Sequence, residues 1–160
     1  MKDAYLNTIA LIERLHRQFL EVVRTELDSL GVQDINNVQG LILFNIGSAE
    51  LTVGELTLRG CYLGSNVSYN VKKMVENGYL IQERSAHDRR SIRVRLSQKG
   101  LDLCADLDAM HDRHIEALGQ TPVSAETLTE ATATLRRVDR FWTHIVDRGV
   151  RVLSRISPAA

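Results

Sequence analysis

The segment from Ser65 to Asn77 separates into an apolar face and a polar face when it is wound as an α-helix at about 100° per residue. The apolar face consists of Val67, Val71, Met74 and Val75. The polar face consists of Ser65, Tyr69, Lys72, Lys73 and Glu76, with Asn66 and Ser68 at its margins. Such a helix packs on a core with one side and leaves the other side for solvent or a partner. We therefore expect a compact lobe built around it.

A β-hairpin is predicted directly after this helix. Gly78 ends the helix, residues 79–84 have the composition of a strand, and residues 91–96 alternate between apolar and basic side chains. The alternation turns two arginines outward, and the positions expected to face inward are Ile92, Val94 and Leu96. Ser97 then has the position of an N-cap for a helix over about 98–118. The hairpin thus has a charged tip and is followed at once by a helix.

Three helices are predicted before the amphipathic one. Their ranges are about 3–30, 37–46 and 53–59, from apolar residues at helical spacing. Gly31 and Gly47 are placed to end the first two helices, and Asn36–Asn37 offers a cap for the second. Thr52 and Glu55 have the spacing of a capping box, which starts the third helix.

The C-terminal segment carries an apolar seam. After a break at Gly119–Pro122, Ser124 is positioned to cap a last helix. Its apolar positions step by three and four residues, and they are Leu128, Ala131, Leu135, Val138, Trp142 and Ile145. Steps of this kind allow a helix to pack along another helix, which a second chain can supply.

Charge is unevenly distributed along the chain. The 160 residues include 20 Lys and Arg and 20 Asp and Glu, so the formal net charge is zero. From Ser65 to Lys99, however, there are eight basic residues and three acidic ones, a net charge of +5. Because the whole chain is neutral, the remaining residues together carry a net charge of −5. A basic centre with acidic ends is expected when one surface faces phosphate and the remainder does not.

These elements in this order predict a mainly α-helical fold. A short helix, a turn, an amphipathic helix and a basic β-hairpin form a winged helix-turn-helix, whose second helix enters the major groove of DNA. We expect this DNA-binding lobe over residues 35–100, and a helical dimerisation lobe over residues 1–34 and 101–160. The hydrophobic content of 44% is sufficient for a core.

The sequence also resembles a known family, the MarR family of bacterial transcription regulators, over essentially its whole length. The resemblance rests on Glu55-Leu56, on Gly64–Leu80, on Asp88-Arg-Arg90 and on Val94-Arg-Leu-Ser-Gln-Lys-Gly100. In that family, Asp88-Arg-Arg90 looks like the Asp-x-Arg signature of a wing. The segment Val94–Gly100 looks like the residues that follow the wing, with a leucine, a hydroxyl cap and a lysine-glycine pair. Two features depart from the family pattern: Leu63 replaces a capping serine or threonine, and Gly60–Tyr62 replaces a more apolar segment.

The resemblance implies a set of DNA contacts. Ser65, Asn66, Ser68 and Tyr69 are expected to face base edges, and Lys72 and Lys73 to lie near phosphates. We expect Arg84 to lie on the same DNA-binding surface. At the wing, Asp88 would pair with Arg90, while Arg89 or Arg90 reaches a minor groove. The simpler alternatives are a solvated basic hairpin, and a Tyr69 ring that rests on the wing.

The resemblance implies, second, a small aromatic or phenolic effector bound between the dimerisation helices and the DNA-binding lobe. Candidate lining residues are His16, Phe19, Phe44 and Tyr62, although a plain core role is the favoured interpretation of each. His111 and His114 share a helix face with Asp108 and could hold a metal, but solvated surface is the favoured interpretation because a fourth ligand is missing.

Other classes of protein are disfavoured. The chain has no nucleophile elbow, Walker loop or HExxH motif, so we expect no enzyme, no cofactor and no metal. It has no apolar run long enough for a membrane and no secretory pattern at its N-terminus, so a cytoplasmic location is expected. Cys61 and Cys104 are interpreted as buried thiols, with a redox role for Cys61 as the alternative.

The sequence thus predicts a homodimeric, ligand-responsive regulator of transcription that binds pseudo-palindromic duplex DNA. The alternative is a winged-helix protein-interaction module that does not bind DNA.

Overall fold

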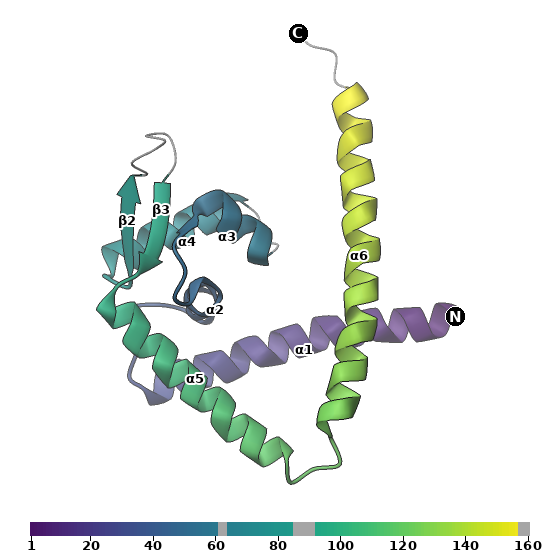
Figure 1. Cartoon of the computed structure of the whole chain (residues 1–160), viewed down its shortest axis with the longest axis horizontal. Coiled ribbons are helices and arrows are strands. Elements are labelled where there is room, and N and C mark those ends of the chain that lie inside the picture. The colour runs from purple at the N-terminus through teal and green to yellow at the C-terminus, as the bar shows by residue number, and fades with distance from the viewer. Residues whose placement is uncertain (61–63, 85–91, 157–160) are drawn as a thin grey trace. The chain divides into compact units, whose positions relative to one another are not determined.

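The computed structural model describes residues 1–60, 64–84 and 92–156 of the chain (Figure 1). The chain divides into two compact units, Met1–Asp112 and Arg113–Ala160. Each unit is described by itself below. The assignment of separate DNA-binding and dimerisation lobes is a matter of function and stays a prediction.

The helices and hairpin strands follow the predicted ranges to within one or two residues. The elements are α1 Lys2–Ser29, α2 Asn37–Ile46, β1 Leu51–Thr52, α3 Val53–Gly60, α4 Gly64–Glu76, β2 Leu80–Arg84, β3 Ile92–Leu96, α5 Gln98–Leu118 and α6 Ala125–Ile156. Local hydrogen bonding explains most of the boundaries, because each predicted N-cap in the described residues accepts a backbone N–H.

Side-chain caps begin four of these helices. The Asn36 side chain accepts the Gln39 N–H at 2.9 Å before α2. Before α3, the Thr52 hydroxyl accepts the Glu55 N–H at 3.1 Å. The Ser97 hydroxyl accepts the Gly100 N–H at 3.1 Å, and the Ser124 hydroxyl accepts the Thr127 N–H at 3.3 Å. Each cap satisfies a backbone donor that has no partner inside the helix, and this fixes the first residue of the helix.

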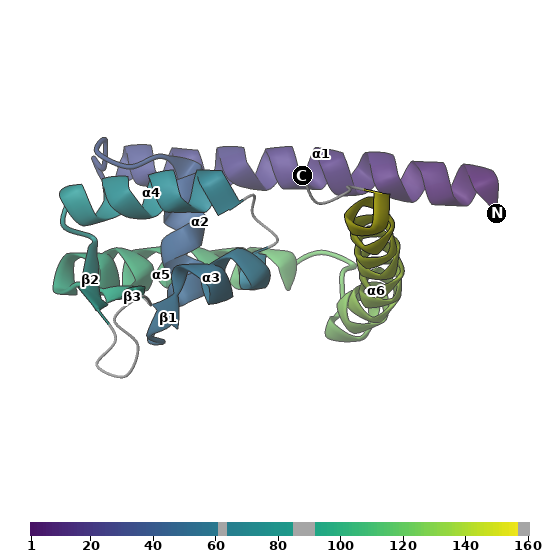
Figure 2. The ribbon, with the colours of Figure 1, turned by 90° about the horizontal axis from the view of Figure 1, so that it is seen from above.

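The sheet has three strands, so the prediction of a two-stranded wing was incomplete. Its strand order is β1-β3-β2, all antiparallel, with Leu51 opposite Val94 and Thr52 opposite Arg93 (Figure 2). At two residues, β1 is too short for its alternation to be recognised in sequence.

The inward direction predicted for Ile92 was also wrong. Val94 and Leu96 are buried at 0% and 5% exposure, but Ile92 is 38% exposed. Ile92 pairs with Arg84 at the far end of the β2–β3 ladder, one residue beyond the part of β3 that pairs with β1. The sheet is narrower there and leaves the side chain partly uncovered.

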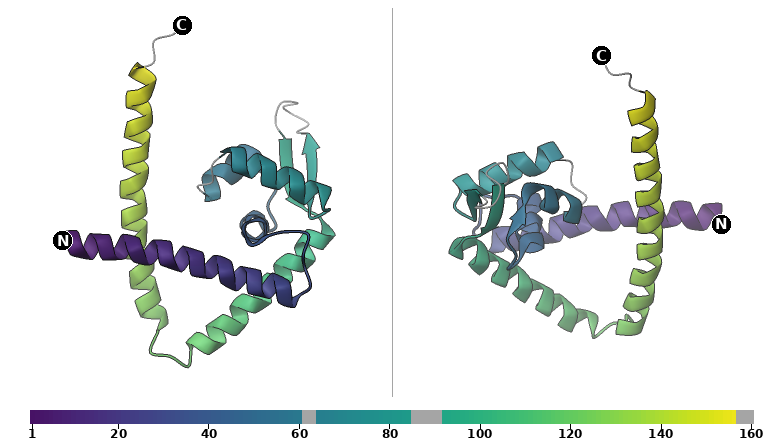
Figure 3. Two further views of the ribbon diagram at one scale, coloured as in Figure 1. Left: turned by 180° about the vertical axis from the view of Figure 1, so that it is seen from behind. Right: turned by 45° about the horizontal axis from the view of Figure 1, so that its top comes forward.

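The core of the first unit is centred on α2. This helix lies between α1 and the α3–α4 pair (Figures 1 and 3). The most deeply buried side chains of this unit come from six elements, and they are Val23, Ile42, Leu43, Ile46, Leu56, Val67, Met74, Val94, Leu107 and Met110. The core therefore holds α4 through its apolar face, as the sequence predicted.

In the second unit, α6 leaves several of its described apolar side chains open to solvent. Leu128, Leu135 and Ile145 of the predicted seam are 50%, 42% and 51% exposed, while Val138 and Trp142 are half-buried. Surfaces of this kind on a single chain indicate a binding partner. In the described parts of the chain, no helix combines the length and the apolar character that crossing a bilayer requires.

Candidate nucleic-acid interface

Helix α4 carries most of the side chains predicted to contact DNA. Val67, Val71 and Met74 face the core with exposures of 0%, 3% and 0%. On the other side Tyr69 is 62% exposed. The remaining predicted α4 residues whose side chains are described are also exposed, and they are Asn66, Ser68, Lys72 and Lys73. The side chain of Ser65 lies outside the described part of the chain. The buried apolar face thus fixes α4 on the core, and the polar face of the same helix is left exposed.

Glu76 moderates the positive charge of α4. Its carboxylate accepts a hydrogen bond from Lys73 Nζ at 2.9 Å and lies 3.9 Å from Lys72 Nζ. The hydrogen bond raises the pKa of Lys73 and lowers the pKa of Glu76. Lys73 therefore stays charged at neutral pH, and an approaching phosphate competes with one carboxylate for two ammonium groups.

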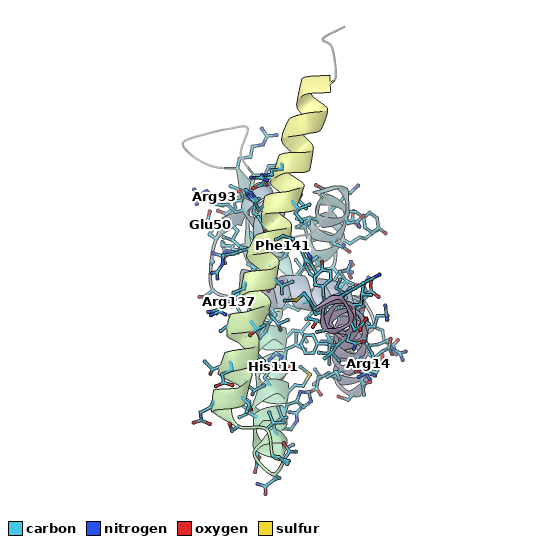
Figure 4. All side chains as sticks on the ribbon, turned by 90° about the vertical axis from the view of Figure 1, so that its right-hand side faces the viewer. Arg14, Glu50, Arg93, His111, Arg137 and Phe141 are labelled. Carbon is cyan, nitrogen blue, oxygen red and sulfur yellow. The ribbon has the colours of Figure 1, made fainter. Side chains whose placement is uncertain are left out.

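The strands contribute further cations. Arg84 is exposed and forms no ion pair within residues 1–60, 64–84 and 92–156. Arg95 pairs with Glu83 at 2.9 Å, and Arg93 lies 3.9 Å from Glu50 (Figure 4). The predicted wing tip, with Asp88, Arg89 and Arg90, lies outside the described residues, as do Cys61, Tyr62 and Leu63.

Lys99 belongs to a structural network, although the sequence counted it within the basic centre. Its ammonium donates to Asp34 at 2.6 Å and to the Asn77 carbonyl at 3.0 Å, and lies 3.9 Å from the centre of the Tyr79 ring. The Tyr79 hydroxyl donates to Asp34 at 2.7 Å, and the Asn77 side chain donates to the Asp34 carbonyl. The network joins the loop after α1 to the ends of α4, β2 and α5. In the sequence, only the lysine-glycine pair at Lys99 and Gly100 pointed to this network.

Asp34→Asn is expected to reduce the loss of stability in acid. Burial raises the pKa of Asp34, but hydrogen bonds from Lys99 and Tyr79 outweigh it and hold the pKa below its usual value. A lowered carboxyl pKa gives stability that is present above the unfolded pKa of about 3.9 and is lost as pH falls through the folded value. Melting temperatures measured across this range should therefore fall less steeply in the variant. Equal slopes would contradict the network, and Tyr79→Phe should give an intermediate slope.

Two of the four predicted effector-site residues meet at an aromatic cluster. The ring of His111 lies 6.1 Å from the Phe19 ring in a stacked arrangement and 4.8 Å from the Phe44 ring edge-on, measured between centroids. Phe19 and Phe44 are 37% and 39% exposed, so the favoured interpretation that they are plain core is wrong. His16 is exposed. The sequence missed His111, whose half-buried ring differs from the solvated surface favoured for it.

A shallow cavity of about 330 Å³ adjoins the cluster, and its lining is Phe44, Gly47, Cys104, Ala105 and Asp108. Burial, together with the charge of Asp108, raises the pKa of the half-buried Cys104 thiol to about 11. Cys104 therefore stays a neutral thiol at physiological pH and is a weak nucleophile. Among the described residues, His, Cys, Asp and Glu side chains form no group of three suited to a metal.

Comparison with known proteins places this geometry in a family. A MarR family model matches residues 33–91. The exopolysaccharide II synthesis transcriptional activator ExpG of Rhizobium meliloti (strain 1021) is 39% identical over 146 residues, which cover 91% of this chain and 75% of ExpG. The chain belongs to the MarR family. The regulator class expected from the sequence resemblance is thereby confirmed.

Several solved structures share the fold. FabT of Streptococcus pneumoniae in complex with DNA superposes with a TM-score of 0.71 at 18% identity, over 88% of this chain and 99% of FabT. AbsC, a MarR family transcriptional regulator of Streptomyces coelicolor, gives a TM-score of 0.72 at 16% identity, over 90% of this chain and 97% of AbsC. At these identities the likeness concerns the fold, and it confirms the predicted winged helix-turn-helix class.

Proposed function

We propose that this MarR family protein regulates transcription as a homodimer that binds pseudo-palindromic duplex DNA in a sequence-specific way. The observation that carries the proposal is the exposed polar face of α4, fixed from behind by Val67, Val71 and Met74. An α-helix presented in this way fits the major groove of B-DNA. That FabT was solved in complex with DNA supports the same use of the fold.

The proposed contacts follow from the placement of the side chains. Tyr69 is exposed in the middle of α4, and with Ser65, Asn66 and Ser68 it is proposed to face base edges. Lys72, Lys73 and Arg84 are proposed to lie against phosphates, which attract cations without regard to sequence. At the wing, we propose that Asp88 pairs with Arg90 and that Arg89 or Arg90 enters the minor groove.

A second copy of the chain is the proposed partner of the exposed apolar helices. In α1, Leu11 and Leu15 are 45% and 51% exposed, and in α6 Phe141 and Val146 are 55% and 62% exposed. Long helices that leave such side chains open in one chain are typical of subunit interfaces. A twofold dimer would place two copies of α4 about 34 Å apart, in successive turns of the major groove.

The aromatic cluster is the proposed effector site. Phe19, Phe44 and His111 come from three different helices, and each ring remains partly open beside the cavity at Cys104. Flat aromatic compounds bind between such rings by stacking and by edge-to-face contacts. We therefore propose a small aromatic or phenolic effector. We propose no catalytic activity, and a cytoplasmic location fits the proposed role.

The proposed interface is tested by two substitutions on α4. Lys72→Ala should weaken binding to all duplexes and lower the slope of log affinity against log salt by about one, because one phosphate contact is lost. Tyr69→Ala should instead change which sequences are preferred. Gel shifts on selected and scrambled duplexes over a salt series measure both effects. The same gel shifts repeated in the presence of benzoate test the effector site.

Arg24→Ala is the matched control, because Arg24 is an exposed arginine on α1 that is paired with Glu21 at 2.7 Å, much as Lys72 is paired with Glu76. The control should keep the wild-type slope. An unchanged slope for Lys72→Ala would reject the assigned face. Failure of the wild-type chain to retain any duplex at low salt would favour the alternative of a protein-interaction module.

A further inference from the structure

Helix α6 carries a row of basic side chains spaced by four residues. This basic row consists of Arg136, Arg140, His144 and Arg148, all of them exposed. Arg137 is exposed beside it (Figure 4). Residues four apart are neighbours on a helix surface, at a rise of about 6 Å per step. The arginines of the basic row thus lie along one ridge of positive charge about 18 Å long.

The arginines of the basic row differ from most other cations of the described chain. Elsewhere among the described residues, seven lysines and arginines pair with nearby carboxylates, as Arg17 does with Glu13 and Arg95 with Glu83, although Arg84 does not. Within the parts of the chain that the structure describes, none of the arginines in the basic row forms an ion pair, although Asp139 and Asp147 lie in the same stretch. Like charges four residues apart destabilise a helix slightly. A negative partner opposite the basic row would therefore stabilise it.

The same chain contains a row of the opposite sign. On α5, Asp108, Asp112 and Glu116 are exposed and are also spaced by four residues; we call them the acidic row. They too form no ion pair among the described residues. Ridges of residues four apart interdigitate when two helices pack, so the basic row and the acidic row have matching pitch and opposite charge.

Chain connectivity argues against pairing of the two rows within one molecule. If α6 folded back along α5 about the segment 119–124, each residue before this segment would meet the residue equally far after it. Glu116 would then meet Thr127, and Asp108 would meet Leu135. Only the first arginine of the basic row would come near a carboxylate. A second copy of the chain is not bound by this register.

We propose that the basic row of one protomer docks against the acidic row of its partner in the homodimer. The inference rests on the homodimer of the proposed function and adds to it which charged surfaces meet. Two equivalent contacts result from the twofold symmetry, because each protomer supplies one row of each sign. Opposed charges of this kind set the register and the choice of partner while apolar side chains supply the bulk of the interface.

Charge exchange between full-length chains tests the proposal. Arg136→Glu/Arg140→Glu reverses the basic row, and Asp112→Arg/Glu116→Arg reverses the acidic row. Each variant alone should dimerise about tenfold or more weakly than wild type at low salt, because both contacts then oppose like charges. An equimolar mixture should form a heterodimer close to wild-type affinity, since both of its contacts are again complementary. Sedimentation equilibrium with one labelled variant measures the dimer affinity of each variant alone and of the mixture.

The outcomes separate this proposal from the homodimer itself. Asp102→Arg/Asp106→Arg, which makes the same charge change on α5 outside the acidic row, should leave dimerisation unchanged, and circular dichroism checks the helices of every variant. A wild-type dimer that neither reversal weakens overturns the pairing and leaves the homodimer standing. Weakening without rescue in the mixture also overturns it. A wild-type chain that stays monomeric overturns the homodimer, and the pairing with it.

Discussion

Gly100→Ala is expected to lower the free energy of unfolding by about 3 kcal/mol, through overpacking at a point where no side chain can yield. A Cβ atom at this position would lie 2.3 Å from the Tyr79 carbonyl oxygen and 3.3 Å from the Tyr79 carbonyl carbon. The contact is with backbone, so relief requires α5 and the start of β2 to move apart. Glycine is thus required here for close approach.

The Tyr79 carbonyl cannot easily withdraw. It accepts the Ser97 backbone N–H at 2.9 Å and the Ser97 hydroxyl at 3.1 Å, and Lys99 lies over the Tyr79 ring. Movement of Tyr79 would therefore strain the cap of α5 and the network around Asp34 together. The lysine-glycine pair of the family motif has a structural explanation in this packing, since Lys99 binds the loop after α1 and Gly100 admits the strand.

Urea unfolding of Gly100→Ala beside Gly54→Ala measures the effect. Gly54 lies in the first turn of α3, where an added Cβ would meet only the Thr52 hydroxyl oxygen at 3.9 Å. Alanine has the higher helix propensity, so Gly54→Ala should be neutral or slightly stabilising. Equal free energies of unfolding for the two variants would show that α5 and β2 separate without cost, contrary to the packing described.

Periodicity and capping predicted most of the fold, because both are local properties. The faces of α4 followed from residue spacing alone, and Asn36, Thr52, Ser97 and Ser124 fixed helix starts through bonds that span three residues. The strand β1 was missed because its two residues take their conformation from pairing with β3, more than 40 positions away in sequence. Ile92 was misplaced for a related reason, since alternation cannot show where a sheet ends.

The candidate site was predicted less completely, because charge counting does not reveal counterions. Lys99 was counted with the basic centre, yet Asp34, which lies 65 positions earlier, neutralises it. Similarly, His111 showed no signal for its contacts with Phe19 and Phe44, since three helices far apart in sequence bring these rings together. Tertiary partners of single residues are non-local, so a one-dimensional pattern contains little information about them.

Stability and DNA binding should separate at two adjacent residues of α4, Lys73 and Met74. Met74 is fully buried, and Met74→Ala should lower the free energy of unfolding by about 2–5 kcal/mol, because the cavity left in the core cannot collapse completely. Lys73 is an exposed side chain paired with Glu76 at 2.9 Å, and Lys73→Ala should leave stability nearly unchanged. Its effect should appear in the salt dependence of DNA binding, with a slope lower by about one.

The comparison requires each property to be measured under conditions where both variants are folded. Chemical denaturation gives the free energies of unfolding, and DNA titrations over a salt series at low temperature give the slopes. Met74→Ala should then bind with the wild-type slope, since its substitution removes no charge. If Met74→Ala and Lys73→Ala changed both quantities together, the two faces of α4 would not be independent. The apolar face would then be part of the recognition surface, and the assignment of DNA contacts to the polar face alone would be wrong.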